Sequence, residues 1–217
     1  LCPPLDGTYR RSLDQIIIKM SPPTSRAEQL LTHPSPPRQA LVELQQELLA
    51  LYDEIVCWAD DRPPSWIPTL VGHVWRDAHG TGGHSYCCPG PVEEYFDGEI
   101  VPIPFGQRFL TTSIIVYVAA AWNSWRSVHV IYLDLLVRVA KGLGQEQHIP
   151  SYMQRVGSLA AGIKASIPYH LSRDVEEYIQ QANSGLALEH SDHLVRGLLL
   201  LHPLYAAARC TVMDTSN

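Results

Sequence analysis

The stretch FLTTSIIVYVAAAWNSWRSVHVIYLDLLVRVAK, residues 109–141, decides the fold. At 100° per residue, the polar side chains of its second half fall within a narrow arc and the apolar ones lie elsewhere. The arc consists of Asn123, Ser127, Asp134, Arg138 and Lys141. The first half is apolar all round, but its apolar run is too short to cross a bilayer. We therefore expect one long central helix, amphipathic only in its second half, that packs inside other helices and does not span a membrane.

A second strong helical pattern precedes this stretch. Apolar residues recur at spacings of three and four, with Ser35 as the expected N-cap and Pro36 at the first helical position. The apolar positions are Leu41, Leu44, Leu48, Leu51, Ile55 and Trp58. The helix should end near Asp60, shortly before two prolines.

Shorter patterns complete an all-α prediction. They predict helices over residues 12–20, 25–32, 151–167, 172–183 and 191–209. Pro22 and Pro23 should separate the first two, and Pro203 should kink the last or begin a new helix. We expect about seven helices around the central one. Residues 1–38 would form N-terminal helices and a Pro-rich linker, and residues 39–217 a single helical domain.

Between residues 62 and 108 the helical periodicity disappears, and prolines alternate with glycines. This pattern predicts a long loop, with only a weak signal for a strand pair around Tyr95 and residues 100–103. The loop contains five side chains of the types that bind zinc, namely His73, His79, His84, Cys87 and Cys88. Their spacing matches no known pair of zinc ligands. We therefore predict no metal and no cofactor.

Composition and charge limit the function classes. The net charge is −6, from 16 basic and 22 acidic residues without a basic run, so we expect no direct contact with nucleic acid. Five cysteines, with one adjacent pair, favour a reducing compartment. No signal peptide is evident, and Leu1 at the start indicates a fragment.

The central helix also carries the candidate binding residues. Trp122, Trp125 and Tyr132 offer aromatic walls and Arg126 a single cation, as in an apolar pocket with one polar anchor. The same set is typical of an ordinary aromatic core. His129, close to these residues, is more often a hydrogen-bonded core histidine than a catalyst. The sequence contains no catalytic motif that we recognise, and it assigns no catalytic residue.

Four stretches, taken together, resemble the C-terminal regulatory domain of fungal zinc-cluster transcription factors. They are DDRPPSW (60–66), AAAWNSWRSVHV (119–130), IKASIPYHL (163–171) and LLLLHPLYAAARC (198–210). The resemblance covers residues 40 to 210. It marks Trp122, Asn123 and Arg126 as the signature of the central helix, residues 168–169 as a turn, and residues 203–205 as the final core contact. We interpret all of these residues as structural.

The resemblance implies a helical regulatory or effector-sensing domain that binds an apolar small molecule or a protein partner. Such domains act in the nucleus, often form homodimers, and control genes of metabolism or secondary metabolism. For this chain, the cytoplasm is the alternative location. The implied ligand would contact Trp122, Trp125, Arg126, His129 and Tyr132.

The six-cysteine DNA-binding cluster of these transcription factors is absent from the sequence. The chain is therefore either an excised domain or a relative without this cluster that serves another purpose. The second explanation allows an enzyme of secondary metabolism, of the cyclase or isomerase kind, in which His129, Arg126 or His202 would act. A third interpretation is an interaction module that uses its acidic, Pro-rich loop.

Overall fold

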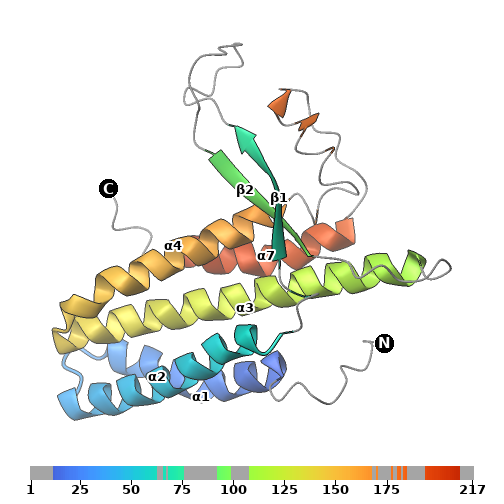
Figure 1. Ribbon diagram of the computed structural model, residues 1–217. Coiled ribbons are helices and arrows are strands. Elements are labelled where there is room, and N and C mark those ends of the chain that lie inside the picture. Colours follow the sequence, from blue (N-terminus) through green and yellow to red (C-terminus); the bar gives the residue numbers. More distant parts are fainter. Residues whose placement is uncertain are drawn as a thin grey trace. The chain divides into compact units, whose positions relative to one another are not determined.

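The structure is a computed structural model that describes residues 12–62, 66, 68–75, 92–98, 108–167, 170, 177, 180–181, 183–184 and 194–210. These residues form five α-helices and one 3-10 turn, Glu146–His148 (Figure 1). The helices are α1 (Leu13–Thr32), α2 (Arg38–Asp60), α3 (Arg108–Leu143), α4 (Ile149–Ala165) and α7 (Leu194–Arg209). The prediction of an all-α fold is confirmed, whereas the predicted number of about seven helices is not confirmed. Most of the helix predicted over 172–183 lies outside the described residues.

Two strands form within the segment that was predicted to be a loop. β1 (Pro68–Trp75) pairs with β2 (Val92–Gly98) in antiparallel register, from Pro68 opposite Gly98 to Trp75 opposite Val92. The loop prediction is therefore wrong for these two segments. The weak strand signal at Tyr95 falls inside β2, and its partner at residues 100–103 lies outside the described residues.

α1 is one helix, although two helices separated by Pro22 and Pro23 were predicted. Its buried residues Ile16, Met20, Pro23 and Ala27 follow spacings of four, three and four. This stripe continues through the prolines, so tertiary burial compensates for the backbone hydrogen bonds that proline cannot donate. α7 likewise continues through Pro203 to Arg209.

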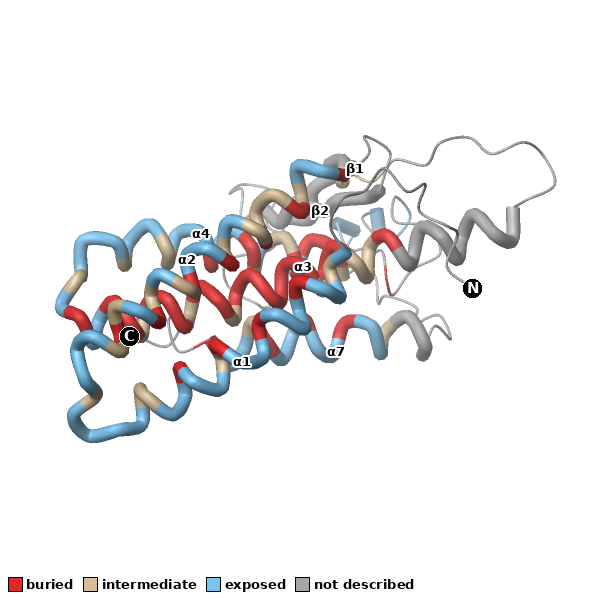
Figure 2. The backbone as a smooth tube through the Cα atoms, turned by 90° about the horizontal axis from the view of Figure 1, so that it is seen from below, coloured by how far each residue is buried: buried red, intermediate tan, exposed pale blue. Residues whose placement is uncertain are grey.

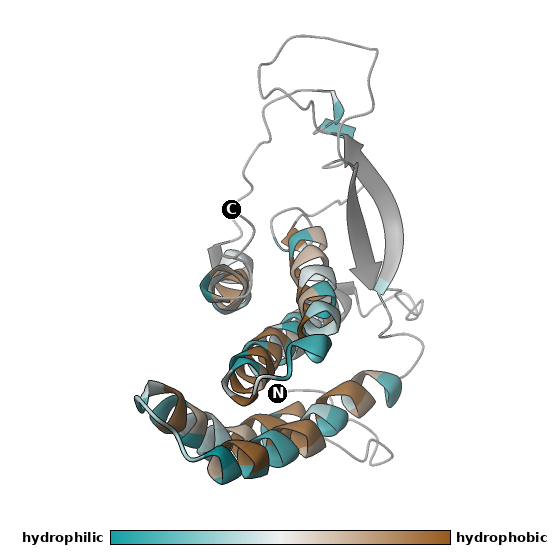
Figure 3. Ribbon diagram, turned by 90° about the vertical axis from the view of Figure 1, so that its left-hand side faces the viewer, coloured by the Kyte–Doolittle hydropathy of each residue, from teal (hydrophilic) through white to brown (hydrophobic). Residues whose placement is uncertain are grey.

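α2 confirms the pattern predicted for it. All six apolar positions, Leu41, Leu44, Leu48, Leu51, Ile55 and Trp58, are buried, and the helix ends at Asp60. Its start differs, because the N-cap is Pro37 and not Ser35. Figure 3 shows brown and teal segments alternating along α1 and α2, as expected of amphipathic helices.

The chain forms two compact units, and α3, α4 and α7 contribute to both. The first unit contains residues 1–63, 124–160 and 205–217, and the second contains residues 64–123 and 161–204. In the first unit, α3 lies between the pair α1–α2 and α4 (Figure 1). The domain boundary predicted at residue 38 stays a prediction.

A bidentate ion pair joins α1 to α3 in the first unit. The Nη1 and Nη2 atoms of Arg138 donate to the two carboxylate oxygens of Glu28 at 2.7 and 3.0 Å. The hydrogen bond from Arg138 lowers the pKa of Glu28. Both side chains reach solvent, so the pair is screened.

We expect Glu28→Ala to lower the free energy of unfolding by only about 0.5–1 kcal/mol, because exposed ion pairs contribute little even in bidentate geometry. Urea unfolding at low and high salt would measure this loss. The exposed Glu146→Ala is the control. A loss that is large and independent of salt would show that the pair is more important than its exposure suggests.

Candidate functional site

The middle of α3 is buried all round, including its polar side chains (Figure 2). Asn123, Ser127 and His129 are 0% exposed, and Arg126 is 9% exposed. The polar arc does not face solvent at Asn123 and Ser127, because neighbouring elements cover this part of the helix. Lys141, near the end of the helix, is exposed. Buried polar groups require partners, so Arg126, Ser127 and His129 define the candidate site in the first unit, and Asn123 defines a polar cluster in the second.

Trp125 anchors the aromatic part of the site in the first unit. Its Nε1 atom donates to the carbonyl oxygen of Ile55 on α2 at 2.7 Å. Its ring stacks on Trp58, with centroids 6.3 Å apart. Tryptophan can be buried in this way because its single polar atom is satisfied. Trp125 thus fixes α3 against α2 and provides one wall of the site.

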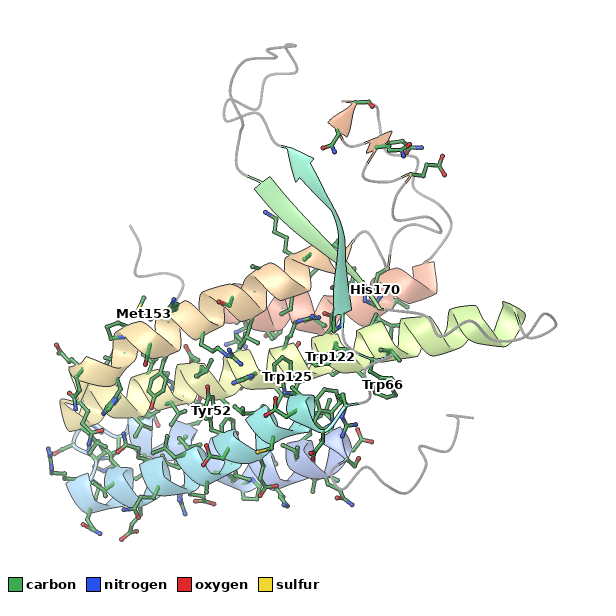
Figure 4. All side chains as sticks on the ribbon, in the orientation of Figure 1. Tyr52, Trp66, Trp122, Trp125, Met153 and His170 are labelled. Atoms are coloured by element: carbon green, nitrogen blue, oxygen red, sulfur yellow. The ribbon has the colours of Figure 1, made fainter. Side chains whose placement is uncertain are left out.

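His129 lies between two aromatic rings. Its ring makes edge contacts with Trp125 and with Tyr52 of α2, both at a centroid distance of 5.0 Å. Figure 4 labels Trp125 and Tyr52. Neither Nδ1 nor Nε2 has a hydrogen-bond partner among the described residues. Burial, assisted by the charge of Arg155, lowers the pKa of His129 to about 4. The prediction of a core histidine is confirmed, but the prediction that it is hydrogen-bonded is wrong.

Tyr132 follows His129 by three residues and is also 0% exposed. Its hydroxyl oxygen has no hydrogen-bond partner among the described residues. Burial, together with the negative charges of Glu47 and Glu54, raises the pKa of Tyr132 above its usual range. The hydroxyl therefore stays protonated. Burial alone lowers the pKa of Arg126 to about 10, which leaves the guanidinium charged at neutral pH.

The structure brings together some of the predicted ligand-binding residues. Trp125 and His129 are in ring contact, and Tyr132 lies one helical turn further along α3. Trp122 belongs to the second unit. His202, a candidate of the enzymatic alternative, lies exposed on α7. Tyr52, which contacts His129, was not predicted, because its spacing places it off the apolar stripe of α2.

In the second unit, Trp122 and Asn123 join three of the four stretches that carry the resemblance. The Nε1 atom of Trp122 donates to the carbonyl oxygen of Trp66. The side-chain amide of Asn123 donates to Ser166 Oγ at 2.8 Å and lies 3.1 Å from His170 Nε2. The structural role predicted for Trp122 and Asn123 fits these contacts.

Ser166 belongs to the same polar cluster as Asn123. Its Oγ contacts Asn123 Oδ1 at 3.1 Å and the carbonyl oxygen of Ile163 at 2.7 Å. Ser166 is 6% exposed and His170 is 0% exposed. Sequence reasoning missed both as partners of Asn123, although an asparagine within an apolar helix is a signal that a polar partner exists.

The last stretch of the resemblance differs from its prediction. Pro203 is buried, but Leu204 and Tyr205 are 40% and 58% exposed. The final core contact predicted for residues 203–205 is therefore wrong for these two residues. The turn predicted at residues 168–169 lies outside the described residues.

We expect Tyr132→Phe to leave the free energy of unfolding unchanged or to raise it by up to about 1 kcal/mol, because an unsatisfied buried hydroxyl costs free energy. Thermal and urea unfolding of the purified chain would measure the change. Tyr205→Phe, which alters an exposed tyrosine, is the control. A loss of about 2 kcal/mol or more would mean that a partner within the chain satisfies the hydroxyl.

Among the described residues, no group of three or more His, Cys, Asp or Glu side chains could hold a metal ion. Of the five zinc-type side chains in the sequence, only His73 lies in a described segment, the strand β1. Within the described part of the chain, no helix is both long enough and apolar enough to cross a membrane.

Comparison with known proteins agrees with the resemblance. The chain is 27% identical over 212 residues to the transcription factor dbaG of Emericella nidulans. The match covers 97% of this chain and 46% of that protein, so the chain spans less than half of its relative. The chain is thus related to a fungal transcription factor. No family model matches it, and no solved structure does.

Proposed function

We propose that the chain is a regulatory module of fungal transcription control, which acts in the nucleus by binding and not by turnover. The observation that carries this proposal is the similarity to a transcription factor over 97% of the chain. The match includes α3 and the polar clusters around it, since it spans nearly all described residues. The target genes would be those of metabolism or secondary metabolism.

We further propose that the module responds to a small molecule through residues of α3. The support comes from the first unit, where the aromatic rings of Trp125 and Tyr52 contact His129, a histidine without hydrogen-bond partners among the described residues. Such a combination of apolar walls and a few polar atoms is typical of ligand sites. That the module binds a protein partner or forms a homodimer stays a prediction.

The enzymatic alternative receives less support. A general acid or base must reach the reacting atoms, and His129 is 0% exposed beneath aromatic rings. His202, the other histidine of this alternative, lies exposed on α7. Of the two functions, binding is therefore the one that the geometry supports better.

A tethering assay tests the proposed function. The 217-residue chain is fused to a heterologous DNA-binding domain in a fungal host that carries a reporter gene. We expect the fusion to change reporter transcription relative to the DNA-binding domain alone. Deletion of the native gene should change the transcript levels of a defined gene set. A silent fusion together with an unchanged transcript profile would overturn the proposal.

A further inference from the structure

We propose that His129 and Tyr132 form a buried site for a neutral aromatic molecule that carries a hydroxyl or carbonyl group. This inference deepens the proposed function and rests on it, because it names the chemistry of the molecule to which the module would respond. The site lies entirely within the first unit, between α2 and α3.

The buried polar atoms of His129 and Tyr132 carry this proposal. His129 Nδ1, His129 Nε2 and Tyr132 Oη are all buried and lack hydrogen-bond partners among the described residues. His129 and Tyr132 are three residues apart on α3, so their side chains share one side of the helix. Buried polar groups in native proteins are nearly always satisfied. We infer that a molecule from outside the chain provides the missing partners.

Aromatic rings surround His129 on two sides. Both rings that contact His129, those of Trp125 and Tyr52, meet it edge-on, at interplanar angles of 73° and 65°. Aromatic walls of this kind favour an aromatic guest, because ring pairs prefer edge-to-face or offset stacking. Tyr52 is only half-buried, so the site lies one side chain below the surface of α2.

His129 and Tyr132 are both neutral in the folded chain at neutral pH. A neutral imidazole offers one donor and one acceptor, and a protonated phenol offers a donor and an acceptor. A hydroxyl or carbonyl group complements these atoms without bringing a charge into the core. The charged groups that act on the two residues are of both signs, Arg155 on His129 and Glu47 and Glu54 on Tyr132. These charges therefore give no clear preference for an anionic or a cationic ligand.

Three one-ring probes test the site on the 217-residue chain. Phenol carries the hydroxyl, toluene has nearly the same shape without it, and benzoate carries a charge. Isothermal titration calorimetry should show phenol binding several-fold more tightly than toluene or benzoate. Tyr132→Phe should weaken phenol binding about threefold to tenfold, the effect of one neutral hydrogen bond, and leave toluene binding unchanged. Tyr205→Phe should leave the binding of both probes unchanged.

A second measurement does not depend on a variant. In protein labelled with nitrogen-15 at histidine, phenol should shift the ring resonances of His129 and leave those of the exposed His202 in place. The proposal is overturned if phenol does not bind, if benzoate binds more tightly than phenol, or if Tyr132→Phe leaves phenol affinity unchanged.

These outcomes are separable from a failure of the proposed function. If phenol does not bind but the tethered chain regulates its reporter, the site is wrong and the regulatory role stands. If phenol binds as expected but the tethered fusion is silent and deletion leaves the transcript profile unchanged, the site stands and the regulatory role is wrong.

Discussion

Between neutral pH and about pH 4, the free energy of unfolding of the His129→Phe variant is expected to fall by about 3 kcal/mol less than that of the wild-type chain. The pKa of His129 falls from 6.5, its ordinary value, to about 4 in the folded chain, mainly because of burial. Above pH 6.5 both folded and unfolded forms of the residue are neutral, so it makes no pH-dependent contribution. As the pH falls from 6.5 to about 4, only the unfolded chain takes up the proton, so the free energy of unfolding decreases.

Urea unfolding at about pH 7 and about pH 4 would measure this effect, because each unit of pKa shift corresponds to ~1.4 kcal/mol. The exposed His202→Phe is the matched control and should lose stability on acidification as the wild type does. If the His129 variant loses as much as the wild type, the residue is not buried in its neutral form.

Asn123→Ala should lower the free energy of unfolding by about 3 kcal/mol, because it removes the amide that contacts Ser166 and His170 and leaves a small cavity. Asn123 is 0% exposed, so water cannot easily replace the lost contacts. Denaturant unfolding of the purified chain would measure the loss. Gln154→Ala, on the exposed side of α4, is the control. Equal stability of the two variants would contradict a structural role for the polar cluster.

The extent of the helices could be predicted where one apolar stripe dominates. The six buried positions of α2 and the extent of α3 follow from spacings of three and four. Local signals failed where tertiary burial opposes them. Pro22 and Pro23 lie inside α1 because the stripe of Ile16, Met20 and Ala27 continues past them. The pairing of β1 with β2 joins segments that are separated in the sequence, and their weak local pattern did not indicate it.

The site could be predicted only in part. Periodicity identified α3 as the central helix and placed His129 off its polar arc, among aromatic residues. It could not show that Asn123 and Ser127 are buried, because a polar arc looks the same whether solvent or a neighbouring element covers it. It also could not find Ser166 and His170, which lie more than 40 residues along the chain from Asn123.

The most direct test of the central claim, that polar atoms buried on α3 serve regulation, is the transcription that tethered variants produce in the fungal host. Tyr132→Phe should fold as stably as the wild type, so a change in reporter output cannot come from unfolding. At equal protein levels, we predict that Tyr132→Phe changes the reporter signal and that Tyr205→Phe does not. If both variants give the wild-type signal, the polar atoms of α3 have no part in regulation.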